Sequence, residues 1–507
     1  MRRKASRTHA EPLGAVAFSA FSPHHQALLR SLAELLGPSR DAFVVGGAIR
    51  DLLLCRAPLG DLDLAVPVEA LETAQALAER LGGRYVCLDA ARGVGRVVIR
   101  SDTQFTQVDL TDFRASSLEA DLQGRDFTID ALAASVRRLV EDGAARIADP
   151  TGGLADLARR RLRLAGPASF QEDPARALRA VRLAGLLGFS LDPEVGRAAR
   201  AIASRLRKVA AERIREELTG ILALPRAGAS LRALDRLSLL PAILPESAPM
   251  RSASQPAPHR FSVWEHSLRT VEAVDRLLAN LSVLAPHRDR IAAHLGDRLG
   301  DSMTRQEVLK LAALLHDVAK PQTRQVVKGR IRFIGHDLAG AEMAKTIAQR
   351  LRLSSEATAV LARLVRQHLR LMHLGQLAEV SRRARYRFFR DLGDEAQDLL
   401  LLTLADAAAV RGLSPGRVGR GALGRLVAGF LGGWQEDRRQ VAVPPLLRGE
   451  DVMAAFGLAP GPGVGRLLGV AREAQDLGVV RTREEALEYL IRHADSAVDT
   501  PEGGLLP

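Results

Sequence analysis

The stretch VVGGAIRDLLLCRAPLGDLDLAV, residues 44–66, decides how the chain begins to fold. A short apolar run ends at Gly46-Gly47, and Gly60 later opens a second apolar run that holds two acids. This order predicts a strand, a tight turn, the start of a helix and a second strand. Backbone N–H groups at such a turn can approach phosphates, and Arg50 can add a charged contact. The stretch therefore predicts a triphosphate site, with ordinary turn chemistry as the alternative.

The two acids of the second strand, Asp61 and Asp63, point to one face because strand side chains alternate. Neighbouring carboxylates repel each other unless a cation lies between them. Oxygen ligands favour Mg²⁺, which bridges nucleotide phosphates and activates an attacking hydroxyl. Asp109, on another predicted strand, could complete a two-metal site. The alternative is a pair of acids on an exposed strand face.

Hydrophobic periodicity divides the chain into a mixed region and a longer helical one. We expect strands at Ala42–Val45, Leu62–Val66, Val97–Arg100 and Gln107–Leu110, and helices at Gln26–Leu36, Leu71–Leu81, Pro174–Leu187 and Val209–Leu224. The predicted fold class is α+β. The expected domains are an N-terminal extension (1–40), an α/β head (41–150), a helical neck (151–245), a helical metal domain (259–410) and a helical C-terminal region (420–507). A linker is expected at 245–258 and a boundary near 411–420.

The charge balance points to a polyanionic partner. Lys and Arg number 72 against 59 acids among 507 residues, so nucleic acid is the first candidate for this partner. The alternative is that the charge is solvated surface charge. Two cysteines, Cys55 and Cys87, fit a reducing compartment and predict a cytoplasmic address. No sustained apolar stretch follows Arg2-Arg3-Lys4, and runs such as Leu426–Trp434 are too short to span a bilayer. We expect neither secretion nor a membrane partner.

Four motifs occur in a fixed order: GGAIRD at 46–51, DLD at 61–63, GRDFTIDA at 124–131 and EDPARALRAVR at 172–182. In this order they resemble the bacterial class II tRNA nucleotidyltransferase and poly(A) polymerase family, within the polymerase β-like superfamily. The resemblance implies a polymerase β-like head in which Gly46, Gly47 and Arg50 hold the triphosphate. It implies catalytic metals on Asp61 and Asp63.

The resemblance also places Arg125 and the segment Asp112-Phe113-Arg114 at the nucleotide. Two positions depart from the family pattern: Gly124 stands where Arg is usual, and Asp130 where Asn is usual. Neither departure touches the metal pair, although both could alter how the nucleotide is handled.

Synthesis without a template requires protein groups that meet the Watson–Crick edge of the incoming base. Asp accepts and Arg donates, so the resemblance implies that Asp173 and Arg176 read cytosine or adenine. On one continuous helix Asp173, Arg176 and Arg179 would share a face. Arg182 would lie about half a turn away, where it could contact phosphate or brace the neck. A solvated i,i+3 salt bridge is the alternative for this segment.

A second constellation lies downstream, where His316-Asp317 follows an apolar run and both groups need partners if buried. The ordered set resembles the HD phosphohydrolase superfamily. That resemblance implies His266, His316, Asp317 and Asp406 as metal ligands, with His336 and His368 completing a two-metal centre. It places Lys320 and Arg324 where a phosphate is expected. Trimming of RNA ends by a phosphodiesterase or phosphatase is the resulting hypothesis, and ordinary surface histidines are the alternative.

These features predict an enzyme that adds CCA, or only its C or A part, from CTP and ATP to the 3′ end of tRNA, releasing diphosphate. Mg²⁺ is expected in the head and a divalent metal in the HD-like domain. A poly(A) polymerase is the second enzymatic reading, which the HD-like region argues against. Two alternatives come from other functional classes: a phosphohydrolase with an inert RNA-binding head, and a non-catalytic RNA-binding module. For the last hundred residues we expect contact with the tRNA backbone. The sequence carries no signal for an oligomeric state.

Overall fold

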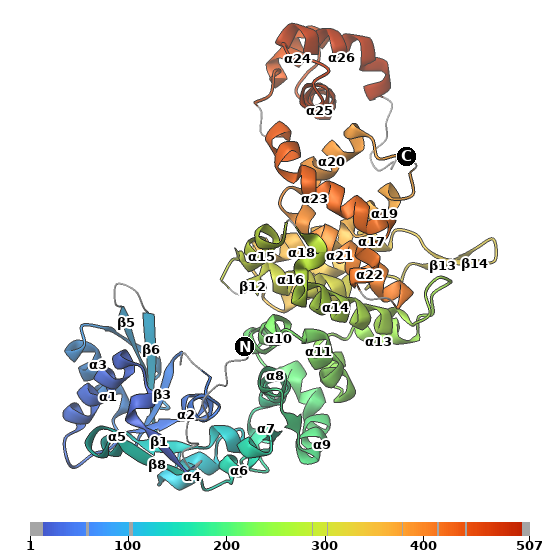
Figure 1. The fold of residues 1–507 in the computed structure, drawn as a ribbon. Helices are drawn as coiled ribbons and strands as arrows, with labels where there is room; N and C mark the ends of the chain where they lie inside the picture. The colour runs from blue at the N-terminus through green and yellow to red at the C-terminus, as the bar shows by residue number, and fades with distance from the viewer. Residues whose placement is uncertain are drawn as a thin grey trace, which may run out of the picture. The chain divides into compact units, whose positions relative to one another are not determined.

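The computed structural model describes residues 14–56, 60–100, 105–285, 287–301, 303–377, 379–412, 415–441 and 444–498. The basic N-terminal triplet lies outside these ranges. Contacts divide the chain into two compact units, one of Met1–Glu217 with Ala233–Ile243, and one of Leu218–Arg232 with Leu244–Pro507 (Figure 1). No helix in the described part of the chain is both long and apolar enough to cross a bilayer.

An eight-stranded mixed sheet forms the centre of the first unit, in the order β1-β8-β7-β2-β3-β6-β5-β4. Its strands are β1 (Ala15–Ala17), β2 (Phe43–Val45), β3 (Leu62–Val66), β4 (Arg84–Asp89), β5 (Val94–Arg100), β6 (Phe105–Asp112), β7 (Ala133–Ser135) and β8 (Ala144–Ala148). The pair of β3 and β6 is parallel, and the other neighbours are antiparallel. The strands expected near residues 43, 62, 97 and 107 are confirmed, whereas β1, β4, β7 and β8 carried no clear sequence signal.

The two faces of this sheet differ, because alternation sends apolar and acidic side chains of β3 in opposite directions. Leu62 and Leu64 are buried on the face that α3 covers through β5 and β6, and α1 packs on α3 and α5. The opposite face carries Val45, Ala65 and Ala133, packed against Leu122 of α4. The helices are α1 (Pro23–Leu36), α2 (Gly47–Leu53), α3 (Ala70–Arg80), α4 (Leu118–Gln123), α5 (Val136–Asp142) and α6 (Gly153–Ala158).

Short helices continue the first unit after the sheet, as the helical periodicity predicted. They are α7 (Ser169–Glu172), α8 (Arg176–Leu187), α9 (Pro193–Ile202) and α12 (Leu240–Ile243), with a small parallel pair of β9 (Arg161–Leu162) and β10 (Ser190–Leu191). Two further helices, α10 (Ala211–Ala223) and α11 (Ala227–Arg236), contribute residues to both units.

Helices dominate the second unit. They are α13 (Ser247–Ser252), α14 (Val263–Ala279), α15 (Arg288–Gly296), α16 (Arg305–Leu315), α17 (His336–Arg350), α18 (Ser355–Gln367), α19 (Arg370–Leu374), α20 (Arg382–Leu392), α21 (Glu395–Arg411), α22 (Pro415–Gly419), α23 (Ala422–Val441), α24 (Gly449–Phe456), α25 (Pro462–Asp476) and α26 (Arg483–Val498). Two small antiparallel pairs join them: β11 (Arg298–Leu299) with β12 (Met303–Thr304), and β13 (Arg324–Val327) with β14 (Arg330–Phe333). Helix α13 lies inside the stretch expected to be a linker, so that expectation was wrong over residues 247–252.

Helix α21 is the central element of the second unit. Its run LLLLTLADAAAV is buried on nearly every side, as expected for a helix that is apolar all round. It packs against α14 and α16, and α16 packs against α18. These four helices, together with α17, which begins at His336, carry the acids and histidines of the second constellation or lead directly into them.

The last three helices form a core of their own, which includes Val452, Leu467 and Leu490. Buried Glu473 of α25 accepts ion pairs from Arg383, Arg387 and Arg390 of α20. Tyr386 of α20 donates to Asp476 of α25. Because several charged groups of α20 converge on one buried carboxylate, the C-terminal helices are held to α20 by a specific polar contact.

Candidate active site and metal cluster

Two of the three predicted head carboxylates lie directly opposite each other in the sheet. Asp63 of β3 is in register with Asp109 of β6, and Asp61 precedes β3 by one residue with the same side-chain parity. Desolvation by the surrounding protein, followed by repulsion from Asp109, raises the pKa of Asp63, although the residue reaches solvent. The structure therefore brings acids together on one strand face, where a bound cation would relieve their repulsion.

Arg96 of β5 is a neighbour of this group that sequence reasoning missed. Its Nε and Nη2 atoms donate to the two oxygens of Asp109 at 2.7 and 2.8 Å. This bidentate pair fixes the orientation of the Asp109 carboxylate. The signal was the alternation of VGRVVIR, but only the pairing register of β5 with β6 places Arg96 opposite Asp109.

The glycine turn lies beside the same carboxylates. Gly46 has φ +71°, and a Cβ atom there would lie 3.3 Å from Arg125 Nη1 and 3.7 Å from Asp63 Oδ2. Gly46 N–H donates to Leu132 O at 3.1 Å. The first hydrogen bond of α2 runs from Arg50 N–H to Gly46 O, which leaves the N–H groups before Arg50 at the open end of the helix.

Arg50 is buried behind this turn. It donates to Asp51 at 2.9 and 3.0 Å and to Asp130 at 2.5 Å. Burial raises the pKa of Asp130 to about 6, against the opposing effect of Arg50. In this structure Arg50 braces the turn from inside. Its expected contact with a triphosphate stays a prediction.

A group of cations stands near the carboxylates. Desolvation, reinforced by the nearby charges of Arg125 and Arg176, lowers the pKa of Arg114. Arg125 donates to Asp121 at 3.2 and 3.3 Å. The Asp112 carboxylate accepts from Ala70 N–H at 2.8 Å and so caps α3. Crowded guanidiniums of this kind favour an anion between them.

The expected continuous helix from Asp173 onward was wrong. Asp173 has extended backbone and ends α7, and α8 begins only at Arg176. Asp173 accepts from Arg213 at 2.5 Å and from Ala175 N–H at 3.1 Å. Arg176 Nε lies 3.9 Å from Asp173 Oδ2, so the two stay neighbours although no common helix face joins them. Pro174 explains the break, because proline disfavours helical backbone at the residue before it.

Arg179 and Arg182 share a partner on α10 that the sequence did not reveal. Glu217 lies 3.5 Å from Arg179 Nε and 2.6 Å from Arg182 Nε. Arg179 also pairs with Asp126 at 3.1 Å. Arg182 is thus engaged within the helical neck, where it holds α8 to α10.

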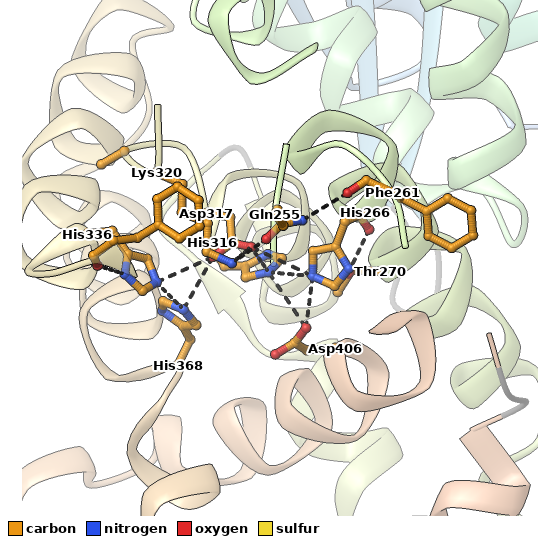
Figure 2. A network of polar contacts seen from close by, with 12 residues as sticks. Gln255, Phe261, His266, Thr270, His316, Asp317, Lys320, His336, His368 and Asp406 are labelled. Carbon is orange, nitrogen blue, oxygen red and sulfur yellow. Dashed lines mark hydrogen bonds and ion pairs between the residues drawn. The ribbon is translucent and has the colours of Figure 1, made fainter. Parts of the chain in front are cut away.

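The second constellation converges into a buried cluster, seen from close by in Figure 2. Asp406 comes from the middle of α21 and His266 from α14, whereas the other ligands follow or begin helices. Two trios form, each with donor atoms within 4.8 Å of one another: His266, His316 and Asp406, and Asp317, His336 and His368. Asp317 belongs to the second trio but also contacts the first, because its Oδ1 is 3.5 Å from His336 Nε2 and its Oδ2 is 3.3 Å from His316 Nε2.

Three of these imidazoles have a tautomer set by the backbone. Nδ1 lies 3.0 Å from Ala313 O in His316, 2.7 Å from Phe333 O in His336 and 2.7 Å from Val365 O in His368. A carbonyl can only accept, so each Nδ1 carries the proton, and in the neutral ring each Nε2 presents a lone pair. His336 Nε2 and His368 Nε2 are 3.3 Å apart. Two lone pairs at that distance repel each other unless a cation lies between them.

The spacing also fits shared coordination. Two imidazole nitrogens at about 2.1 Å from one metal are separated by roughly 3.0–3.4 Å for octahedral to tetrahedral angles. The observed separations are 3.3 Å for His336 with His368 and 3.2 Å for His266 with His316. Buried His266 Nδ1 has no hydrogen-bond partner. The donor set and geometry therefore fit two divalent metals.

Electrostatics keeps the acids ionised and one histidine neutral. Burial favours the protonated form of Asp317, but His316 and Lys320 outweigh burial and hold the pKa of Asp317 well below its usual range. Burial, reinforced by His316, lowers the pKa of His368 to about 4. Lys320 donates to Asp317 and to Gln255 Oε1, both at 2.7 Å. Gln255 was missed because its position in the polar stretch before α14 gives no sign of this contact.

Three family models match consecutive parts of the chain. The Poly A polymerase head domain matches residues 42–163, the model described as "Probable RNA and SrmB- binding site of polymerase A" matches 188–250, and the HD domain matches 263–409.

Similar curated proteins span nearly the whole chain. An A-adding tRNA nucleotidyltransferase of Deinococcus radiodurans is 37% identical over 90% of this chain and 96% of its own length. A CC-adding tRNA nucleotidyltransferase of Thermus thermophilus is 38% identical over 89% and 93%. Among solved structures, a CCA-adding enzyme in its apo form I has a TM-score of 0.64 at 19% identity, over 97% of this chain and 100% of its own. A Thermotoga maritima CCA-adding enzyme complexed with tRNA has a TM-score of 0.58 at 19% identity, over 95% and 99%. At these identities the two structures establish the fold alone.

Proposed function

The chain belongs to the tRNA nucleotidyltransferase family, and from that premise we propose that its head adds the CCA sequence, or its C or A part, to the 3′ end of tRNA. CTP and ATP are the nucleotide donors. The 3′ hydroxyl attacks the α-phosphate, an O–P bond forms, the bond to the bridging oxygen breaks, and diphosphate leaves.

One observation carries this proposal: the register that sets Asp63 opposite Asp109, with Asp61 two residues before Asp63 on the same parity. Asp61 and Asp63 would hold Mg²⁺, which supplies charge neutralisation of the phosphates and a lower pKa for the attacking hydroxyl. Desolvation by burial and then repulsion from Asp109 raise the pKa of Asp63, and a bound cation would relieve that repulsion. Arg96 holds Asp109 in one orientation beside them.

Basic groups of the head would bind the nucleotide. The N–H groups at the start of α2 and the guanidinium of Arg125 border Asp63, so they can hold the leaving diphosphate. Arg114 lies close to Arg125 and adds a further positive charge.

Asp173 and Arg176 would select the base. Both side chains are only partly buried, and together they offer an acceptor and donors for the Watson–Crick edge of cytosine or adenine. Arg213 donates to Asp173. Arg179 and Arg182 would support this surface through Glu217.

The product is decided by supplying nucleotides one at a time. Three tRNA transcripts, ending before CCA, after the first C and after CC, are incubated with the pure chain, Mg²⁺ and either CTP or ATP. We expect at most three added nucleotides. Two C residues only would define a CC-adding enzyme, one A on the CC-ended transcript an A-adding enzyme, and the full set a CCA-adding enzyme. Long tails of A would overturn the proposal in favour of a poly(A) polymerase.

A second activity is favoured by the facing lone pairs of the buried cluster. We propose that His266, His316, Asp317, Asp406, His336 and His368 hold two divalent metals and that the site hydrolyses phosphate esters at RNA ends. Bound metals would supply Lewis acidity and a nucleophile at neutral pH. Lys320 would orient Asp317, which it contacts. The test is hydrolysis of bis(p-nitrophenyl) phosphate with Mn²⁺, Ni²⁺, Zn²⁺ or Mg²⁺; activity with none of them would overturn this proposal.

A further inference from the structure

The hairpin of β13 and β14 lies between Lys320 and His336 in the chain. Its composition differs from that of the helices around it. Residues 324–333 hold Arg324, Lys328, Arg330 and Arg332 and no acid. All four cations are exposed. No ion pair joins any of them to an acid in the described part of the chain. Four free positive charges on one short hairpin attract a polyanion.

The turn presents one of these cations at the tip. Lys328 and Gly329 both have positive φ, 50° and 73°, as in a two-residue turn of the type that matches strand twist. Lysine is an uncommon residue for that conformation. Lys328 therefore belongs to the turn beyond the last strand pair, Val327 with Arg330, and the β13–β14 ribbon extends away from the helices of its unit (Figure 1).

The two faces of the hairpin carry different chemistry, because residues paired across an antiparallel ribbon share a face. The pairs Gln325 with Arg332 and Val327 with Arg330 place two guanidiniums on one face. The pairs Arg324 with Phe333 and Val326 with Ile331 make the other face mainly apolar, and Val326 is 63% exposed. Single-stranded nucleic acid requires this combination, because the cations contact its phosphates and the aromatic and aliphatic surface contacts its bases.

The base of the hairpin is tied to the cluster. Phe333 O accepts the Nδ1–H of His336 at 2.7 Å. Lys320 Nζ, which contacts Asp317, lies 5.5 Å from the centre of the Phe333 ring. The mainly apolar face therefore begins next to the groups that would act on a phosphate ester. A single strand of RNA that lay along the hairpin would bring its own end to these groups.

We propose that the β13–β14 hairpin is an RNA-binding arm that holds the phosphate backbone of a single-stranded RNA end beside the His/Asp cluster. The choice of an RNA end rests on the proposed hydrolytic function of the cluster. Binding itself rests on the charge and the exposed apolar face of the hairpin.

The test measures salt-dependent RNA binding by the full chain. Fluorescence anisotropy of a labelled tRNA transcript that ends in CCA gives Kd at several KCl concentrations for the parent, for Arg330→Gln/Arg332→Gln and for Lys328→Gln. The matched control is Arg276→Gln/Arg288→Gln, which removes two exposed cations of the same unit. We expect the double hairpin variant to bind roughly tenfold more weakly at 0.1 M salt and its log–log salt slope to fall by about 1 to 2, since each lost phosphate contact with a single strand lowers the slope by about 0.7. Lys328→Gln should lower the slope by about half as much.

A control variant that matches the parent, together with a weaker hairpin variant, supports the arm. Equal slopes for the parent and the double hairpin variant, or an equal loss in the control, would overturn it. Failure of the hydrolytic proposal is recognised separately, because bis(p-nitrophenyl) phosphate involves no RNA: a parent chain that binds RNA through the hairpin but leaves this compound intact would refute the hydrolysis and keep the arm.

Discussion

The sheet site of the head and the helical His/Asp cluster both gather acids for cations, but they are built in opposite ways. Asp63 reaches solvent on a strand face, and its neighbour Asp109 is anchored by a single arginine. In the cluster, His266, His316 and Asp317 are each 1% exposed, and backbone carbonyls set three of the imidazole tautomers. An open site suits a long polymer end and an incoming triphosphate, whereas a buried site offers metals a preorganised donor set.

The largest expected effect concerns the open site. Asp61→Ala or Asp63→Ala should lower the rate of nucleotide addition by about 10³-fold or more, because each removes a carboxylate that would hold Mg²⁺. The assay is incorporation of labelled CTP or ATP into tRNA. Asp142→Asn removes an exposed acid of the same unit and should leave the rate unchanged. A residual rate above a tenth of the parent's would show that the two acids do not carry the chemistry.

Removal of metal should lower the thermal stability of the unit that contains the His/Asp cluster. Metal bound at 100 times its Kd stabilises the folded state by about 2.7 kcal/mol, so chelation should lower the Tm of the second unit by several degrees. His316→Gln should abolish this response. His294→Gln is the matched control, since His294 is a buried histidine paired with Asp398 outside the cluster. A parent chain whose Tm ignores the chelator, or a His294→Gln variant that loses the response, would contradict metal binding by the cluster.

Sequence reasoning reached the two sites to different depths, for a physical reason. Strand alternation is local, so the shared face of Asp61 and Asp63 could be read directly from residues 61–66. The residues that lie opposite these acids depend on strand pairing, which is why Arg96, the partner of Asp109, was missed. The cluster needs five helices, α14, α16, α17, α18 and α21, to meet, and no spacing along the chain encodes that packing; it was predicted only through a family resemblance. The helix expected through Asp173 failed at Pro174, where a local rule should have been applied.

A smaller effect concerns base selection on the open side. Asp173→Ala removes the proposed acceptor for the base amino group, so kcat/KM for the cognate nucleotide should fall by about 10- to 100-fold. Arg213→Gln is the matched variant, because it breaks the ion pair with Asp173 but leaves the acceptor in place. If Asp173 only held Arg213, both variants would lose the same activity for CTP and ATP. Discrimination lost in Asp173→Ala alone would establish the reading role.

The smallest effect is a pH dependence of head stability. The pKa of Asp130 is about 6 when folded and about 4 when unfolded, so the folded state holds an extra proton between these values. Its contribution to stability is present below pH 4 and is lost as pH rises through 6. Asp130→Asn removes this dependence, so the variant should gain about 1 to 3 kcal/mol relative to the parent between pH 4 and pH 7. Parallel urea titrations at both pH values measure the change; a constant difference would rule out the buried titration.

The most direct test of two independent active sites is one parallel measurement on the parent, Asp63→Asn and His316→Gln. Each preparation is assayed for nucleotide addition to tRNA and for hydrolysis of bis(p-nitrophenyl) phosphate under identical conditions. We predict that Asp63→Asn loses addition and keeps hydrolysis, while His316→Gln keeps addition and loses hydrolysis. Loss of both activities in either variant, with its far-UV circular dichroism still matching that of the parent, would contradict the separation of the two chemistries.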